Sequence, residues 1–90
     1  MLYLVTMTLN PGVTINDVQS AMQPAHSWYR CTPTSWVVCT RENATAWANR
    51  LMPYTQPQGT LFVCRLLPTD HQGWMTQEFW NWWNLHVGHA

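Results

Sequence analysis

The amino-acid sequence predicts one α+β domain of the ferredoxin-like class, βαββαβ, with a four-stranded antiparallel sheet and a short Trp-rich C-terminal helix. Strand-like and helix-like segments follow one another in the order of the split βαβ pattern. The chain has 90 residues, which is the length of one domain. Hydrophobic residues make up 47% of it, and this content favours a dense core or a core shared with a partner.

The first strand and the first helix are predicted from the opening residues. Residues 1–9 are apolar and β-rich, and the Asn-Pro-Gly turn at 10–12 ends the run. Thr14 is a suitable N-cap, with Asp17 three residues later in the first helical turn. Apolar residues at helical spacing then predict an amphipathic helix over 15–22.

The middle of the chain predicts a hairpin and a second helix. Segments 27–31 and 35–40 are aromatic and β-branched, and a Pro-containing turn separates them. Asn43 can cap a helix whose apolar stripe runs over 44–52. Pro53 is expected to end this helix, because proline lacks the backbone N–H that would continue it.

The last predicted strand, residues 60–67, is apolar on both sides. Phe62 and Cys64 lie on one face, and Leu61 and Val63 lie on the other. Polar residues do not alternate with apolar ones, so both faces of the sheet are expected to be covered. The two predicted helices cover only one face, so a second copy of the chain or the C-terminal segment must cover the other.

That C-terminal segment is rich in aromatic residues. We divide the chain into the ferredoxin-like domain, residues 1–67, and an extension, residues 68–90, that packs on the sheet or on a partner subunit. Trp80 and Trp83 share a helical face in the extension, and Trp82 points elsewhere. One face of a monomer is not expected to bury all three, so they predict a dimer clamp or a lid over a ligand.

Charge and cysteine content limit the partners. There are four Arg, four acidic residues and no Lys, so the chain lacks the basic surface that extended nucleic acid needs. One or two Arg could still grip a small anionic ligand. The three Cys show no CxxC spacing, and no apolar run approaches the ~20 residues of a membrane span. We therefore expect a cytoplasmic protein without a membrane partner, a cofactor or a metal.

The strand motifs, taken in order, resemble a known family. The residues concerned are Tyr3-Leu4-Val5-Thr6, Asn10-Pro11-Gly12, Ser27-Trp28-Tyr29-Arg30, Thr34-Ser35-Trp36-Val37-Val38 and Leu61-Phe62-Val63. They are similar to the small SinR-family proteins, which resemble the ferredoxin-like CRISPR-associated endoribonucleases. The resemblance covers about residues 1–67.

Two departures from the family pattern bear on its chemistry. In nuclease members, an Asp at the end of the first strand binds a divalent metal across the dimer axis, and Thr8 stands at that position here. A neutral hydroxyl is a poor Mg²⁺ ligand, because the hard cation favours anionic oxygen. Arg30 replaces the His of the hairpin strand. The resemblance therefore implies that the metal nuclease site is lost and that the chain is not an enzyme.

The predicted ligand-binding residues are Trp28, Arg30, Trp36, Arg65 and Thr8. Aromatic rings and a guanidinium can hold a base by stacking and a phosphate by paired hydrogen bonds. The alternative for Arg30 is an exposed side chain lying over a core Trp. Arg65 is either a pocket residue or an ion-pair partner at an interface. We expect the ligand where the hairpin meets a subunit interface or the C-terminal tryptophans.

These features predict a non-catalytic binding protein that works as a homodimer or a higher homo-oligomer. It would act as a sponge for a small anionic, nucleotide-like ligand, such as a cyclic-oligonucleotide immune signal, in anti-defence on behalf of a phage or mobile element. The phage setting follows from analogy alone. One alternative is a protein-interaction module or an inhibitor of a host defence protein. Another is a divergent small ribonuclease that uses Asp70 and His71.

Overall fold

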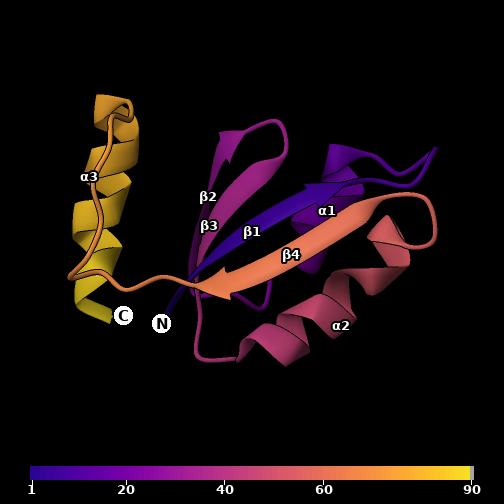
Figure 1. The fold of residues 1–90 in the computed structure, drawn as a ribbon, viewed down its shortest axis with the longest axis horizontal. Coiled ribbons are helices and arrows are strands. Elements are labelled where there is room, and N and C mark those ends of the chain that lie inside the picture. Colours follow the sequence, from indigo (N-terminus) through magenta and orange to yellow (C-terminus); the bar gives the residue numbers. More distant parts are fainter. Residues whose placement is uncertain (90) are drawn as a thin grey trace.

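The computed structural model describes residues 1–89, and its side chains are described through residue 88. Its elements, drawn in Figure 1, are β1 (Leu2–Thr8), α1 (Ile15–Ala21), β2 (Ser27–Thr32), β3 (Ser35–Cys39), α2 (Ala44–Thr55), β4 (Thr60–Arg65), α3 (Gln77–His86) and the 3₁₀ turn η1 (Val87–His89). The β-α-β-β-α-β order confirms the predicted ferredoxin-like class. Within the described residues, no helix is long and apolar enough to cross a membrane.

The four strands form one antiparallel sheet in the order β2-β3-β1-β4. Val5 of β1 lies opposite Trp36 of β3 and Val63 of β4, so these three share a face. The first core lies on this face, under α1 and α2, and its largest fully buried side chains include Trp36 and Trp47. The alternation of side chains along each strand therefore fixes which residues the two helices cover.

The two predicted helix starts are confirmed. The Thr14 hydroxyl accepts a hydrogen bond from the Asp17 backbone, and the Asp17 carboxylate accepts one from the Thr14 backbone at 2.9 Å. Asn43 accepts a bond from the Ala46 backbone, also at 2.9 Å. Each cap satisfies N–H groups that have no partner inside the helix, so each fixes where its helix begins.

The predicted end of the second helix was wrong, because α2 continues through Pro53 to Thr55. Proline gives up one backbone bond, but the helical ladder resumes behind it. The Thr55 hydroxyl donates to the Leu51 carbonyl at 3.1 Å, and the Gln56 N–H donates to the Met52 carbonyl at 3.0 Å. The last predicted strand is also shorter, since β4 ends at Arg65.

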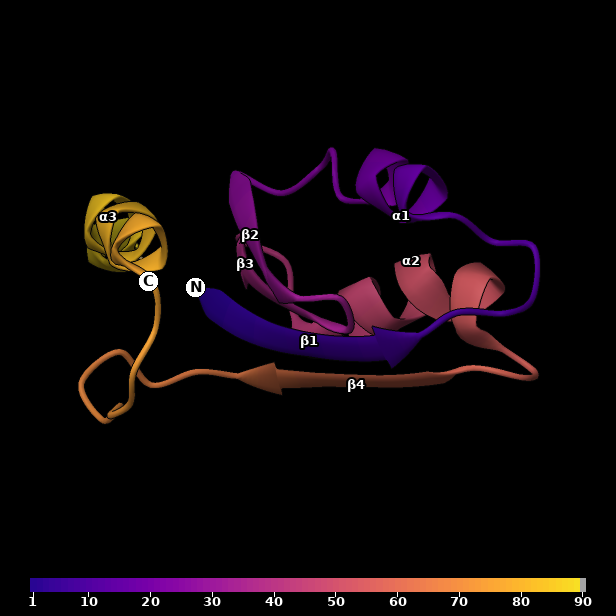
Figure 2. The same ribbon diagram turned by 90° about the horizontal axis from the view of Figure 1, so that it is seen from above.

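The C-terminal helix packs on its own sheet and covers part of the second face. Figures 1 and 2 show α3 apart from α1 and α2, beside the end of the sheet where β1 begins. A second core forms there, and its buried residues are Leu2, Val37, Cys39, Phe79 and Trp83. Trp80 and Trp82 are only half-buried against this core, so one chain does not fully bury all three tryptophans.

The geometry of the sheet face explains how α3 still packs through all three tryptophans. Trp82 is half-buried against the second core and reaches the edge strand β2. Its indole N–H donates to the Ser27 hydroxyl at 2.8 Å, and its ring lies 5.9 Å from that of Tyr29. The twisted sheet therefore offers α3 a surface wide enough to receive side chains from more than one helical face.

Candidate functional site

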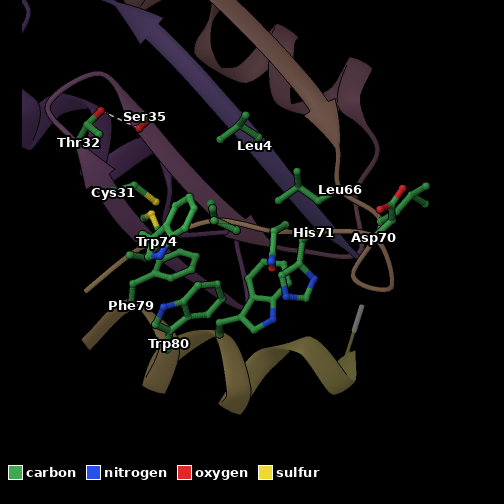
Figure 3. Close-up of a pocket in the computed structure, with 16 residues that line it drawn as sticks. Leu4, Cys31, Thr32, Ser35, Leu66, Asp70, His71, Trp74, Phe79 and Trp80 are labelled. Carbon is green, nitrogen blue, oxygen red and sulfur yellow. Dashed lines mark hydrogen bonds between the residues drawn. The ribbon is translucent and has the colours of Figure 1, made fainter. Parts of the chain in front are cut away.

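An aromatic cavity lies between α3, the second sheet face and the loop that joins β4 to α3. Its volume is about 410 Å³, within the roughly 300–1,000 Å³ of small-molecule pockets. The sheet, the loop and the helix each supply part of its wall (Figure 3). The lining residues are Leu4, Cys31, Thr32, Ser35, Val37, Leu66, Leu67, Asp70, His71, Gln72, Gly73, Trp74, Met75, Phe79, Trp80 and Trp83.

Flat rings dominate one wall of this cavity. The His71 ring lies 4.9 Å from the Trp83 ring and 6.0 Å from the Trp80 ring, measured between centroids. Phe79 meets Trp80 edge to face, with centroids 5.1 Å apart. Trp74 stands on the loop with 95% of its surface exposed. Phe79 and Trp83 are almost fully buried, so the rings open to a planar ligand are those of His71, Trp74 and the half-buried Trp80. Stacking on such rings is the interaction that aromatic side chains offer a base.

A few polar groups lie among these rings. The Thr32 and Ser35 hydroxyls form a hydrogen bond to each other at 2.7 Å on the sheet side. One ring nitrogen of His71 is 2.8 Å from the Pro68 carbonyl oxygen, which holds the imidazole against the helix. Asp70 supplies a carboxylate, and no Arg is among the described lining residues. The cavity therefore fits the base of a ligand better than its phosphate.

Cys31 lines the same cavity from β2. Burial raises the pKa of its thiol, and a hydrogen bond involving the Val37 backbone opposes this shift. A thiol with a raised pKa stays protonated at neutral pH, so it is a poor nucleophile. Cys31 therefore adds an apolar, polarisable surface to the cavity.

The structure places the three predicted ligand-binding residues of the hairpin outside the lining of this cavity. Trp36 is fully buried under α1 and α2, so it has no ring face open to a ligand, and Trp28 is half-buried against the same core. The Arg30 guanidinium lies 5.5 Å from the centroid of the Trp36 ring and donates to the Pro33 carbonyl at 3.0 Å. Arg30 thus matches the alternative expectation of a guanidinium over a core Trp.

The other two predicted residues are also apart from the hairpin. Arg65 ends β4, at the sheet edge opposite the strand of Arg30, so one chain does not bring the two guanidiniums together. Thr8 is exposed at the end of β1, and its hydroxyl meets the Thr60 hydroxyl at 2.8 Å. The five predicted ligand-binding residues therefore do not form one site within a single chain.

The ribonuclease alternative named two residues that the structure does bring to the cavity. Asp70 and His71 lie together on the loop wall. In the part of the chain that the structure describes, no three His, Cys, Asp or Glu side chains are grouped as metal ligands would be.

Sequence reasoning predicted that the C-terminal tryptophans form a dimer clamp or a ligand lid, and it missed the loop. Residues 66–76 contain Asp70, His71 and Trp74, but they have neither helical nor strand periodicity. Their placement follows from the docking of α3, because the loop runs past the end of the sheet and turns beside this helix (Figures 1 and 2). The one available signal was the Trp at position 74, a large apolar residue beside a loop glycine.

Comparison with known proteins leaves the class to be defined by structure. No family model, curated protein or solved structure matches the chain. The class is therefore a ferredoxin-like α+β domain with a C-terminal helix folded over the second sheet face. The resemblance to SinR-family proteins stays a prediction.

Proposed function

We propose that this chain is a non-catalytic binding protein whose aromatic cavity holds the base of a small nucleotide-like molecule. The observation that supports the proposal is the cavity wall, where His71, Trp80 and Trp83 lie within 6.4 Å of one another by ring centroids. Stacking a base on an aromatic side chain contributes roughly 1–3 kcal/mol. The absence of Arg from the described lining residues leaves the phosphate outside the cavity, in solvent or against a second copy.

Sequestration is the role that such a site would serve. A protein that holds a small signal molecule lowers its free concentration without altering it. The anti-defence setting, in which a phage or mobile element benefits, rests on the family resemblance. Binding of a nucleotide-like molecule in this cavity does not depend on which organism makes that molecule.

The experiment combines mass spectrometry with calorimetry. Native mass spectrometry of the purified protein should detect a bound small molecule, and titration with adenosine, AMP and cyclic di-AMP should give saturable heat. Trp74→Ala should weaken binding by about 1–3 kcal/mol without unfolding the domain, because the indole is 95% exposed. Leu85→Ala is the control, since Leu85 is 72% exposed on α3 and does not line the cavity.

Exposed apolar residues support a second candidate, the protein-interaction module. Phe62 is 63% exposed, Leu67 62% and Trp74 95%. Leu67 and Trp74 lie together in the lining of the aromatic cavity, and contiguous exposed apolar surface is typical of protein-binding sites. A protein that carries no small molecule and gives no heat with the three nucleosides and nucleotides would favour this candidate over the first.

A further inference from the structure

A second cavity lies where β1 begins and β3 ends. Its volume is about 480 Å³, and its lining includes His26, Cys39, Thr40, Arg41 and Glu42. None of the described residues that line it also lines the aromatic cavity. The two cavities also differ in chemistry, because titratable and hydroxyl side chains dominate this one. It can therefore be tested without reference to the proposed function.

The charges around this cavity favour an anion. Arg41 presents an exposed, positively charged guanidinium. His26 adds an exposed ring that can donate an N–H and that also meets the His86 ring, with centroids 5.6 Å apart. The carboxylate of Glu42 lies 2.5 Å from a nitrogen of Arg50, so a cation already neutralises it. Cys39 contributes no negative charge at neutral pH, because burial raises the pKa of its thiol.

The segment that carries Arg41 is held firmly. Only 3% of the Thr40 surface is exposed. Its hydroxyl accepts hydrogen bonds from the Trp47 indole and the Glu42 backbone, each at 3.1 Å. Its carbonyl accepts a bond from the Met1 nitrogen at 2.7 Å. A donor on a rigid backbone loses less entropy when it binds a ligand, so Arg41 is well placed as a ligand-binding residue.

We propose that this cavity binds a small oxyanion, with the Arg41 guanidinium as the main donor and the His26 ring as a second. The planar guanidinium fork matches the paired oxygens of a phosphate or a carboxylate. The chemistry shared by these two anions is two oxygens that accept parallel N–H bonds. The site is distinct from the aromatic cavity and does not require a base.

The test is a titration of the full chain, followed by amide and His ring signals in NMR spectra at constant ionic strength. Inorganic phosphate and acetate are the two probes. We expect saturable shifts at Thr40, Arg41, Glu42 and His26 with phosphate. Shifts with acetate as well would extend the site to carboxylates, and shifts with acetate alone would assign it to carboxylates.

Two arginine variants make the test specific. Arg41→Ala should weaken binding roughly tenfold or more, the effect of losing a charged hydrogen bond. Arg65→Ala removes the same charge from an exposed position outside the cavity and should change the affinity less than about twofold. Linear shifts without saturation for both anions, or an equal loss in the two variants, would overturn the proposal. Unchanged spectra elsewhere in each variant will show that the domain is folded.

Discussion

Asn10 joins the end of β1 to the turn that precedes β4. Its side-chain oxygen accepts bonds from the backbone N–H groups of Gln58 and Gly59, at 3.0 and 3.2 Å. Its side-chain nitrogen donates to the carbonyls of Pro53, at 3.4 Å, and Gln56. One side chain therefore satisfies several backbone groups of a loop that has no ladder of its own.

Asn10→Ala should lower the free energy of unfolding by about 1–3 kcal/mol, because it leaves these backbone groups without partners. Urea denaturation followed by fluorescence measures the change. Asn84→Ala is the control, since Asn84 is exposed on α3. Equal stability of the Asn10 variant and the parent protein would show that water replaces the side chain at no cost.

Gly59 lies where two segments approach closely. A Cβ atom there would stand 2.0 Å from the Thr8 carbonyl oxygen and 2.7 Å from that of Thr55, so backbone must move. Gly59→Ala should destabilise the fold by about 1–3 kcal/mol or more, the range for overpacking. Thermal melts of the variant measure this change. Gly88→Ala is the control and should leave the melting temperature nearly unchanged, since nothing lies within 4 Å of its Cβ position. Equal melting temperatures for the two variants would contradict the close approach.

The Glu42–Arg50 pair predicts a dependence of stability on pH. The hydrogen bond from Arg50 lowers the pKa of Glu42 below its ordinary value of 4.5. A carboxyl with a lowered folded-state pKa stabilises the fold above its unfolded pKa, and this contribution is lost as pH falls through the folded-state pKa. Arg50→Gln should therefore reduce the loss of stability on acidification from about pH 5 to about pH 3. Urea titrations at several pH values in that range measure how the free energy of unfolding changes with pH. Arg65→Gln is the control and should keep the slope of the parent protein. The same slope in Arg50→Gln would contradict the prediction.

At the scale of elements, α3 is held mainly by two aromatic side chains. Phe79 and Trp83 are 5% and 6% exposed, and both pack against Leu2 and Val37 of the sheet. The first core, under α1 and α2, shares none of these buried residues. The helix can therefore loosen without loss of the main core.

Trp83→Ala should undock α3 and cost about 3–5 kcal/mol of local stability, the range for truncating a buried aromatic. Hydrogen exchange should become faster at 77–86 and stay slow in β1 and β3. Trp74→Ala is the matched control, because it truncates a 95% exposed indole on the adjoining loop. Global unfolding of the Trp83 variant would mean that the two cores form one cooperative unit.

The helices and strands could largely be predicted from the sequence. Which face of the sheet the helices cover could not. Apolar periodicity and caps such as Thr14 and Asn43 are local signals, so they predicted six elements in the right order. Both sheet faces are apolar, so no pattern indicated which face α1 and α2 would cover. That choice buried Trp36 and left Arg30 over its ring. The predicted hairpin site therefore became part of the first core.

At the scale of the whole molecule, α3 leaves part of the second sheet face open. Phe62 is 63% exposed and Cys64 is exposed, both on the edge strand β4. We predict that a second copy covers this surface, as the apolar composition indicated. Light scattering should give a mass above the 10.5 kDa of one chain, and Phe62→Asp should restore the monomer mass. Leu85→Asp, on α3, should keep the assembly, and a monomeric parent protein would contradict the prediction.

The aromatic cavity could be predicted only in part, because it depends on contacts distant in sequence. The Trp-rich tail predicted either a dimer clamp or a ligand lid. The partners of that tail, Leu4 of β1 and Cys31 of β2, lie more than forty residues away along the chain. Only the docking of α3 brings these segments to one place.

The seven tryptophans provide the most direct test of the central claim, that the aromatic cavity is the ligand site. Each indole N–H gives its own signal in a nitrogen-correlated NMR spectrum, so a titration with AMP or cyclic di-AMP reports every ring at once. The account predicts saturable shifts for Trp74, Trp80 and Trp83, with Trp28 and Trp36 unmoved. Shifts confined to Trp28 and Trp36, or no shifts with either nucleotide, would contradict it.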